Sequence, residues 1–328
     1  MLTRRLGAAG PTVSAIGLGA MGMSDFYGPA DESESIATIH AALDAGVTLI
    51  DTGDFYGMGH NEMLIREAFK GRRRENAIIS VKYGAQRDPA GNWLGFAGDP
   101  AATKTALAYT LKRLGTDYID IYRPARVSAV PIEDTIGAIA DLVKAGYVRH
   151  IGLSEAGAAN IRRAHAVHPI VDLQIEYSIM SRSVEREILP VLRELGIGMT
   201  AYGVLSRGLI SDSALAGGSK GGFRSHSPRF QGENLTRNLD LVRALKTVAD
   251  ERGATVAQLA IAWVMSRGED IVPLIGARKR ERLAEALQAM DVTLSAGEIA
   301  RIEAAAPPEA VAGARYAEAQ MAMLDSER

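Results

Sequence analysis

Three ionisable side chains near the ends of apolar runs could together transfer a proton. Asp51 ends the run VTLID, Tyr56 follows it in DTGDFYG, and Lys82 ends the run AIISVK. A phenol, with a reference pKa of about 10, is a weak acid at neutral pH unless a cation lies nearby. Lys82 could supply that charge and Asp51 could orient Lys82, which would make a proton relay. Taken singly, the same residues have ordinary interpretations as a turn aspartate, a surface lysine and a packing tyrosine.

These side chains meet only in a fold that gathers strand ends at one face, and the chain has a suitable pattern. Eight β-rich runs alternate with helical patterns such as 34–46, 101–115, 132–146 and 184–196. The runs are SAIGLG from residue 14, VTLID from 47, AIISVK from 77, YIDIY from 118, VRHIGLS from 148, IVDLQI from 170, GIGMTA from 196 and DIVPLIG from 270. This alternation without a linker predicts an α/β fold, with parallel strands closed into a (β/α)8 TIM barrel as a single domain over residues 1–328.

Three further segments complete the predicted fold. The opening LTRRLGAAGPTVS should form a β-hairpin that caps the bottom of the barrel. Residues 206–231 are rich in Gly, Ser and Arg and too long for a plain connection, so we expect long loops over the C-terminal face that cover a ligand or are disordered. A C-terminal tail should begin at about residue 306.

One motif suggests a different fold and is rejected. GLGAMG, residues 17–22, matches the glycine pattern of a dinucleotide-binding Rossmann turn. Such a turn must lead directly into a helix that holds the pyrophosphate, whereas here MSDFYGPADES follows, with Gly28 and Pro29. A Rossmann domain is therefore not expected.

Composition narrows the class of protein. The chain of 328 residues has 37 basic and 39 acidic side chains and a net charge of -2, which gives no field for nucleic acid or an anionic membrane. It has no cysteine, which excludes disulfides, thiolate nucleophiles and Cys-ligated zinc. No apolar run has signal-peptide or membrane-span length, so we expect a cytoplasmic protein. We also expect no metal site, and either a monomer or a weak homo-oligomer.

Six blocks of the sequence resemble those of the aldo-keto reductases, in the same order and spacing from about residue 4 to 305. They are DTGDFYGMGHNE, ISVKYG, YIDIYR, PIEDTIGAIADLVKAGYVRHIGLSE, LQIEYS and AYGVLSRGLI. The resemblance implies a barrel that binds NADP(H) and moves a hydride between the nicotinamide and a carbonyl or alcohol carbon. That family has a tetrad of Asp, Tyr, Lys and His. Three members correspond to Asp51, Tyr56 and Lys82, with Tyr56 as the general acid in reduction.

The resemblance also implies a cofactor site. Ser154 and Gln174 match the pair that holds the nicotinamide carboxamide, and Tyr202 matches the aromatic residue that stacks on the ring. Glu155 stands where the family usually has Asn, which weakens one contact. The expected cofactor contacts are Gly19, Met21, Asp51, Ser154, Gln174, Tyr202, Gly203, Leu205, Arg207, Gly276, Arg278, Arg282 and Glu285.

The segment IGARKRERLAEAL, residues 275–287, matches the one that receives the adenosine end. Arg278 and Arg282 would bind the 2′-phosphate and Glu285 the adenine, while Ala286 replaces the usual Asn. Judged from the residues alone, a basic run at a helix start suits a phosphomonoester, and the ordinary alternative is a solvated basic face.

The tetrad histidine is missing. By the resemblance, Ala125, in YIDIYRPARV, stands at the position of the family histidine. Of the histidines in the chain, only the loop residue His60 follows Tyr56 closely enough to take over its role. Losing one preorganised donor typically costs about 3 kcal/mol of transition-state stabilisation, which would slow hydride transfer rather than abolish it. Ala125 also leaves room for a water or a bulkier substrate. The expected substrate-facing residues are Phe55, Tyr83, Arg123, Ala125 and Arg126, with Trp93 nearby.

Strand alternation makes a separate prediction for Arg123. If position 125 faces the mouth, Arg123 faces the barrel interior, and Asp172 does so as well because it lies two residues before Gln174. A buried guanidinium needs a partner, so we expect an Arg123–Asp172 ion pair beneath the nicotinamide. The alternatives are an Arg123 that reaches up to the substrate oxygen, or one turned out to solvent.

These observations predict an NADPH-dependent aldehyde or ketone reductase whose partners are a small carbonyl or alcohol substrate and NADP(H). The alternative is a regulatory subunit of the same fold that binds the cofactor with little turnover, which the replacement at Ala125 would allow.

Overall fold

Eight parallel strands form a closed barrel in the computed structural model, which describes residues 1–24, 26–217 and 222–328. Around the barrel the strands follow one another in chain order, and each overlaps one of the predicted runs. The strands are β3 (Gly17–Gly19), β4 (Leu49–Gly53), β5 (Ile78–Tyr83), β8 (Ile119–Pro124), β9 (Val148–Ser154), β10 (Ile170–Glu176), β11 (Gly198–Tyr202) and β12 (Ile271–Gly276). The predicted (β/α)8 barrel is confirmed.

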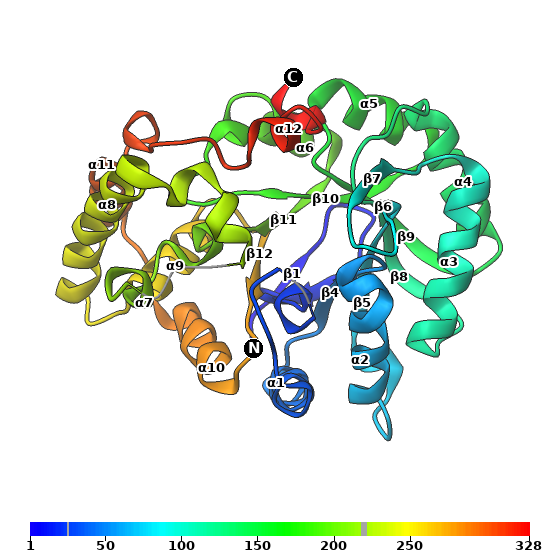
Figure 1. The fold of residues 1–328 in the computed structure, drawn as a ribbon, viewed down its shortest axis with the longest axis horizontal. Helices are drawn as coiled ribbons and strands as arrows, with labels where there is room; N and C mark the ends of the chain where they lie inside the picture. Colours follow the sequence, from blue (N-terminus) through cyan, green and yellow to red (C-terminus); the bar gives the residue numbers. More distant parts are fainter. Residues whose placement is uncertain (25, 218–221) are drawn as a thin grey trace.

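Helices form a ring around the strands (Figure 1). They are α1 (Glu32–Asp44), α2 (His60–Ala68), α3 (Pro100–Leu114), α4 (Ile132–Lys144), α5 (Ala158–Val167), α6 (Ile188–Leu195), α8 (Gly232–Glu251), α9 (Val256–Ser266), α10 (Arg280–Leu287) and α11 (Ala296–Ala305). Local signals set several boundaries: Asp99 caps the start of α3 ahead of Pro100, and Gly115 ends it with a φ of 66°. The helix predicted over 184–196 begins later, at Ile188, because Glu187 is non-helical and Pro190 is tolerated only in a first turn.

A hairpin closes the bottom of the barrel, as predicted. Its strands are β1 (Thr3–Arg5) and β2 (Thr12–Ser14), paired antiparallel. Leu6 and Val13 pack into a small apolar cluster with residues of the barrel strands, including Ile121. Gly7, with a φ of 66°, approaches the barrel so closely that a Cβ there would lie 2.5 Å from the Val171 carbonyl oxygen.

Three loop segments lie beyond the C-terminal ends of the strands. Strands β6 (Ala85–Arg87) and β7 (Trp93–Phe96) form a second hairpin. The sequence analysis did not predict it, because these strands are too short to show a repeating pattern. The segment 206–231 contains the turns η5 (Ser206–Gly208), α7 (Asp212–Leu215), η6 (Gly222–His226) and η7 (Pro228–Phe230), with residues 218–221 outside the described part. After α11 the chain continues through η9 (Pro308–Ala310), α12 (Glu318–Met321) and η10 (Asp325–Glu327), drawn in red in Figure 1.

None of the helices in the described residues has the length and apolar character that a membrane crossing needs. The same residues contain no group of three or more His, Asp or Glu side chains arranged to hold a metal ion.

Candidate active site

The predicted proton-relay residues meet at the barrel mouth. Lys82 forms a buried ion pair with one oxygen of Asp51, and its Nζ lies 5.2 Å from the centroid of the Tyr56 ring. Parallel pairing of β4 with β5 sets Asp51 beside Ser80, whose hydroxyl donates to the second carboxylate oxygen at 2.9 Å. Gln174 donates to the same oxygen at 2.7 Å from across the barrel. The carboxylate is therefore fixed from three sides.

Burial controls the titration of this group. It raises the pKa of Tyr56 well above the usual value, Asp51 raises it further, and the cation of Arg126 acts in the opposite direction. Burial also lowers the pKa of Lys82, while the charge of Asp51 opposes that shift. The phenol of Tyr56 is consequently protonated at any physiological pH, the form in which it can donate a proton.

Arg123 and Asp172 form the predicted ion pair one layer below the mouth. Their atoms Nη1 and Oδ2 are 2.9 Å apart, and both side chains are fully buried. Arg123 also donates to the Leu153 carbonyl at 3.1 Å and to Ser80 Oγ at 2.9 Å. The ion pair fits beside Gly152 because this residue has no side chain: a Cβ there would lie 2.7 Å from Asp172 Oδ1. The expectation that Arg123 contacts substrate is therefore wrong, since strand alternation directs its side chain into the interior.

The predicted carboxamide pair and its aromatic neighbour lie on consecutive strands. Ser154 pairs in register with Gln174, and Tyr202 ends the next strand, β11. The Gln174 amide group donates to Asp51, but the described residues offer no hydrogen bond to its carbonyl oxygen or to the Ser154 hydroxyl. Tyr202 donates its hydroxyl hydrogen to Glu155 at 2.7 Å, so one edge of its ring is anchored.

Ala125, where the resemblance led us to expect the tetrad histidine, is buried directly after the end of β8. Its backbone N–H donates to the Tyr83 carbonyl at 2.8 Å. The next residue, Arg126, is half-buried and donates to the Ala125 carbonyl at 2.6 Å. Within the described chain, no carboxylate lies within 4.0 Å of the Arg126 guanidinium. His60 does not fill the position, because its two ring nitrogens bond Ser24 at 2.9 Å and Glu32 at 2.8 Å.

Aromatic rings surround Tyr56. Phe55 contacts it edge to face with ring centroids 4.8 Å apart, and Phe26 does so at 6.2 Å. Trp93, from the β6–β7 hairpin, stacks on Phe26 at 6.3 Å. The predicted residues Phe55 and Trp93 thus lie together, with ring centroids 6.0 Å apart, whereas no pattern in the sequence pointed to Phe26.

The substrate-facing role expected for Tyr83 is wrong. Its ring is buried against Tyr122 at 4.4 Å, and its hydroxyl bonds Thr103 of α3 at 2.9 Å. The cause is strand alternation: with Lys82 facing the mouth, the next side chain must point outward to the helix layer.

The basic segment expected at the adenosine end surrounds the start of α10. Arg278 donates to the carbonyls of residues 27–29 at 3.0 to 3.2 Å, while Arg282 pairs with Glu285 at 2.8 Å on the exposed face. The neighbouring Arg280 pairs with Glu34 at 3.0 Å. Gly276, at the exposed end of β12, leads into this segment.

The other expected cofactor contacts line the same face. Gly19 ends β3, and Met21 begins the turn η1 (Met21–Met23) directly after it. Gly203 and Leu205 follow β11, and Arg207 donates to Glu176 at 2.9 Å. The structure therefore brings these residues to the rim of the barrel mouth.

The C-terminal segment also reaches this mouth, which the sequence reading did not anticipate. Arg315 forms a buried ion pair with Glu155, with an N–O distance of 2.6 Å. The hydroxyl of Tyr316 lies 2.8 Å from that of Tyr202. The one hint in the sequence was Glu155, which stands where the resemblance implies Asn. In the structure, its backbone has a φ of 53°.

Comparison with known proteins agrees with this geometry. The family model described as the aldo/keto reductase family matches residues 15–307. A protein from Glycine max named probable aldo-keto reductase 1 is 40% identical over 316 residues, which cover 95% of this chain and 91% of that protein.

Two solved structures have the same fold. A glycerol dehydrogenase from Gluconobacter oxydans has a TM-score of 0.83 at 26% identity, covering 93% of this chain and 96% of that one. An aldo-keto reductase from Bacillus halodurans in its holo form has a TM-score of 0.78 at 26% identity, covering 94% and 97%. The chain belongs to the aldo-keto reductase family, whose members are oxidoreductases that act on carbonyl and alcohol groups and typically use a nicotinamide cofactor.

Proposed function

We propose that the protein is an NADPH-dependent reductase of small aldehydes or ketones, in which Tyr56 protonates the substrate oxygen. The observation that carries this proposal is the buried Lys82–Asp51 ion pair beside the Tyr56 ring. Asp51 holds Lys82, Lys82 places a positive charge beside the Tyr56 ring, and the raised pKa of Tyr56 keeps the phenol in its protonated form. A donor that stays protonated suits reduction better than oxidation.

The residues at the mouth fit NADP(H). Ser154 offers a hydroxyl and Gln174 a carbonyl oxygen, both without a hydrogen bond from the described residues, which suits a carboxamide. Tyr202 offers a ring face, while Arg278 and Arg282 offer forked donors at the start of α10, which suit a phosphate. When bound, the nicotinamide supplies the hydride. The role of these residues is to hold and orient it over the mouth.

Because position 125 carries an alanine and no histidine, Arg126 could serve as the donor to the substrate oxygen. Its guanidinium has no carboxylate within 4.0 Å in the described chain, and its charge partly opposes the rise in the pKa of Tyr56 that burial and Asp51 cause. A cation in this position can donate to the substrate oxygen in place of the missing imidazole. We further propose a cytoplasmic, single-domain protein that acts as a monomer or weak homo-oligomer.

Tyr56→Phe tests the proposal. Loss of the proton donor should lower kcat for NADPH oxidation with an aldehyde by at least about 100-fold, while the Kd of NADPH stays nearly unchanged. Tyr109→Phe, at an exposed tyrosine of α3, is the matched control and should have no effect.

Two outcomes would contradict the assignment. A Phe variant with unaltered turnover would remove Tyr56 from the reaction. Tight NADPH binding by the unaltered protein with no NADPH consumption across a panel of aldehydes would favour the regulatory role.

A further inference from the structure

A chain of buried hydrogen bonds joins the Arg123–Asp172 ion pair to the proposed proton relay. Arg123 Nη2 donates to Ser80 Oγ at 2.9 Å, and the Ser80 hydroxyl donates to Asp51 Oδ2 at 2.9 Å. Asp51 in turn forms the ion pair with Lys82. All five side chains are buried in the barrel. The ion pair below the mouth and the relay at the mouth are therefore one connected group.

Strand pairing places the members of this group side by side. Strand β5 pairs with β4 so that Ser80 lies beside Asp51, and with β8 so that Lys82 lies beside Arg123. The carboxylates that pair with the two cations come from β4 on one side and from β10 on the other. Burial lowers the pKa of Lys82, Asp51 opposes this shift, and the cations of Arg123 and Arg126 add to it. The charge of Arg123 therefore acts on the relay directly.

The direction of the hydrogen bonds follows from the chemistry of arginine. A guanidinium has only N–H donors, so the Ser80 oxygen must accept from Arg123. The Ser80 hydroxyl gives its one hydrogen to Asp51 Oδ2. Gln174 donates to the same oxygen at 2.7 Å, which leaves Oδ1 of the carboxylate for Lys82. Hydrogen bonds that follow one another in one direction polarise and strengthen each other in a buried site.

Arg123 is held so that it cannot turn away from Ser80. Its Nη1 donates to Asp172 at 2.9 Å and to the Leu153 carbonyl at 3.1 Å. The same oxygen of Asp172 accepts from the hydroxyl of Thr200 on β11. Because a guanidinium is planar, the bonds at Nη1 also fix the direction of Nη2. Neither side chain of the ion pair has exposed surface, so bulk water does not replace these partners.

We propose that Arg123 is a positioning residue of the active site that acts through Ser80. It orients the Ser80 hydroxyl toward Asp51. The carboxylate of Asp51 then keeps the Lys82 cation beside the Tyr56 ring, 5.2 Å from its centroid. This inference rests on the proposed reductase function, in which Tyr56 protonates the substrate oxygen. It gives an ion pair one layer below the mouth a part in the reaction.

Ser80→Ala tests the connection without removing a charge. The single-turnover rate of NADPH oxidation with propanal should fall about tenfold, because Asp51 loses a preorganised donor, while the Kd of NADPH stays unchanged. Ser80→Thr keeps the hydroxyl and should retain most of the rate. Ser14→Ala is the control, because it removes an equally buried hydroxyl at the bottom of the barrel and should not change the rate. A normal rate in Ser80→Ala would overturn the inference.

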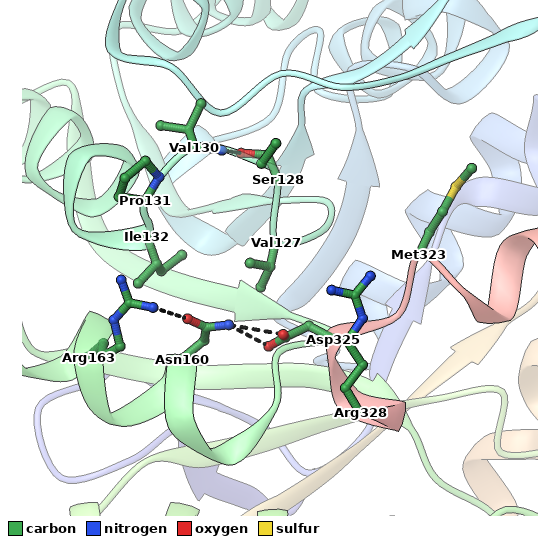
Figure 2. A pocket seen from close by; sticks show the side chains of 11 residues that line it. Val127, Ser128, Val130, Pro131, Ile132, Asn160, Arg163, Met323, Asp325 and Arg328 are labelled. Carbon is green, nitrogen blue, oxygen red and sulfur yellow. Dashed lines mark hydrogen bonds between the residues drawn. The ribbon is translucent and has the colours of Figure 1, made fainter.

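A mutant cycle tests whether Arg123 acts through Ser80. Arg123→Leu with Asp172→Leu should lower the single-turnover rate about threefold or more, and adding Ser80→Ala should lower it only to the rate of Ser80→Ala alone. The control is Arg163→Leu with Glu133→Leu, which removes an exposed ion pair between α4 and α5 and should not change the rate (Figure 2 shows Arg163). Losses that multiply in the triple variant would show independent effects and overturn the inference.

Urea denaturation of the same variants tests the connection without turnover. The triple variant should lose less free energy of unfolding than the sum of the losses in Ser80→Ala and in the double leucine variant, because the bond between Arg123 and Ser80 is removed in both. Additive losses would contradict the connection. If the double leucine variant does not fold, the rates of Ser80→Ala and Ser80→Thr decide. A failure of the proposed function would appear separately, as absent NADPH consumption by the unaltered protein.

Discussion

The guanidinium of Arg123 lies 2.9 Å from the carboxylate of Asp172, and neither side chain is exposed to solvent. The pair occupies the barrel interior directly beneath Lys82 and Asp51, and Ser80 bonds both Arg123 and Asp51 at 2.9 Å. The ion pair is therefore linked through Ser80 to Asp51 of the proposed proton relay.

Removing one partner of this pair should be more damaging than removing both. Arg123→Leu leaves an unpaired buried carboxylate and should lower the free energy of unfolding by about 3 to 5 kcal/mol, whereas Arg123→Leu with Asp172→Leu should recover much of that loss. Urea denaturation measures both variants. Arg243→Leu, at an exposed ion pair of α8, is the control and should change stability by less than about 0.5 kcal/mol. A double variant no more stable than the single one would contradict this interpretation.

Cofactor choice should depend on Arg282. Arg282→Leu should raise the Kd of NADPH about tenfold or more and leave that of NADH nearly unchanged, because only NADPH carries the phosphate that a forked donor recognises. Arg243→Leu removes a similar arginine that also pairs with an acid three residues away, and should alter neither constant. Equal dissociation constants of the two cofactors for the unaltered protein would rule out this role.

Arg126 and the vacancy at Ala125 can be tested together. Arg126→Gln should lower kcat/KM for small aldehydes by about 100-fold with little change in NADPH binding, because a preorganised cationic donor is lost. Adding Ala125→His should restore part of the rate by supplying a neutral donor at the family position. If Arg126→Gln has normal kinetics, another group must contact the substrate oxygen.

Asp54 should make stability fall as the pH rises. Burial and the nearby charge of Glu62 raise its pKa from 3.8 to about 7, and its Oδ1 is buried with no hydrogen-bond partner among the described residues. Because the folded-state pKa is the higher one, the protonated form stabilises the fold below about pH 4, and this stabilisation is lost as the pH approaches 7.

Asp54→Asn removes this titration. The variant should be more stable than the unaltered protein at pH 8, by about 1 to 3 kcal/mol, with a smaller or reversed difference at pH 4. Thermal or urea unfolding at both pH values measures the effect. A difference independent of pH would show that the carboxyl group does not titrate in this range.

Periodicity and strand-end chemistry were enough to predict the barrel, its bottom hairpin and the grouping of Asp51, Tyr56 and Lys82. A side chain on a regular parallel strand has its direction fixed by alternation, and all the carboxyl ends of such strands point to one face. The Arg123–Asp172 pair followed from the same rule. The same alternation on β5 directs Tyr83 outward, because the preceding residue, Lys82, faces the barrel interior.

Only the tertiary structure decided what covers the mouth. The positions of Phe26, of the β6–β7 hairpin and of Tyr316 depend on contacts between loops distant in sequence, and loops have no repeating pattern from which a direction can be read. Glu155 could be recognised as a departure from the family pattern, but its partner Arg315 is 160 residues away. A buried carboxylate requires a cation, and the sequence cannot say which cation the folded chain brings to it.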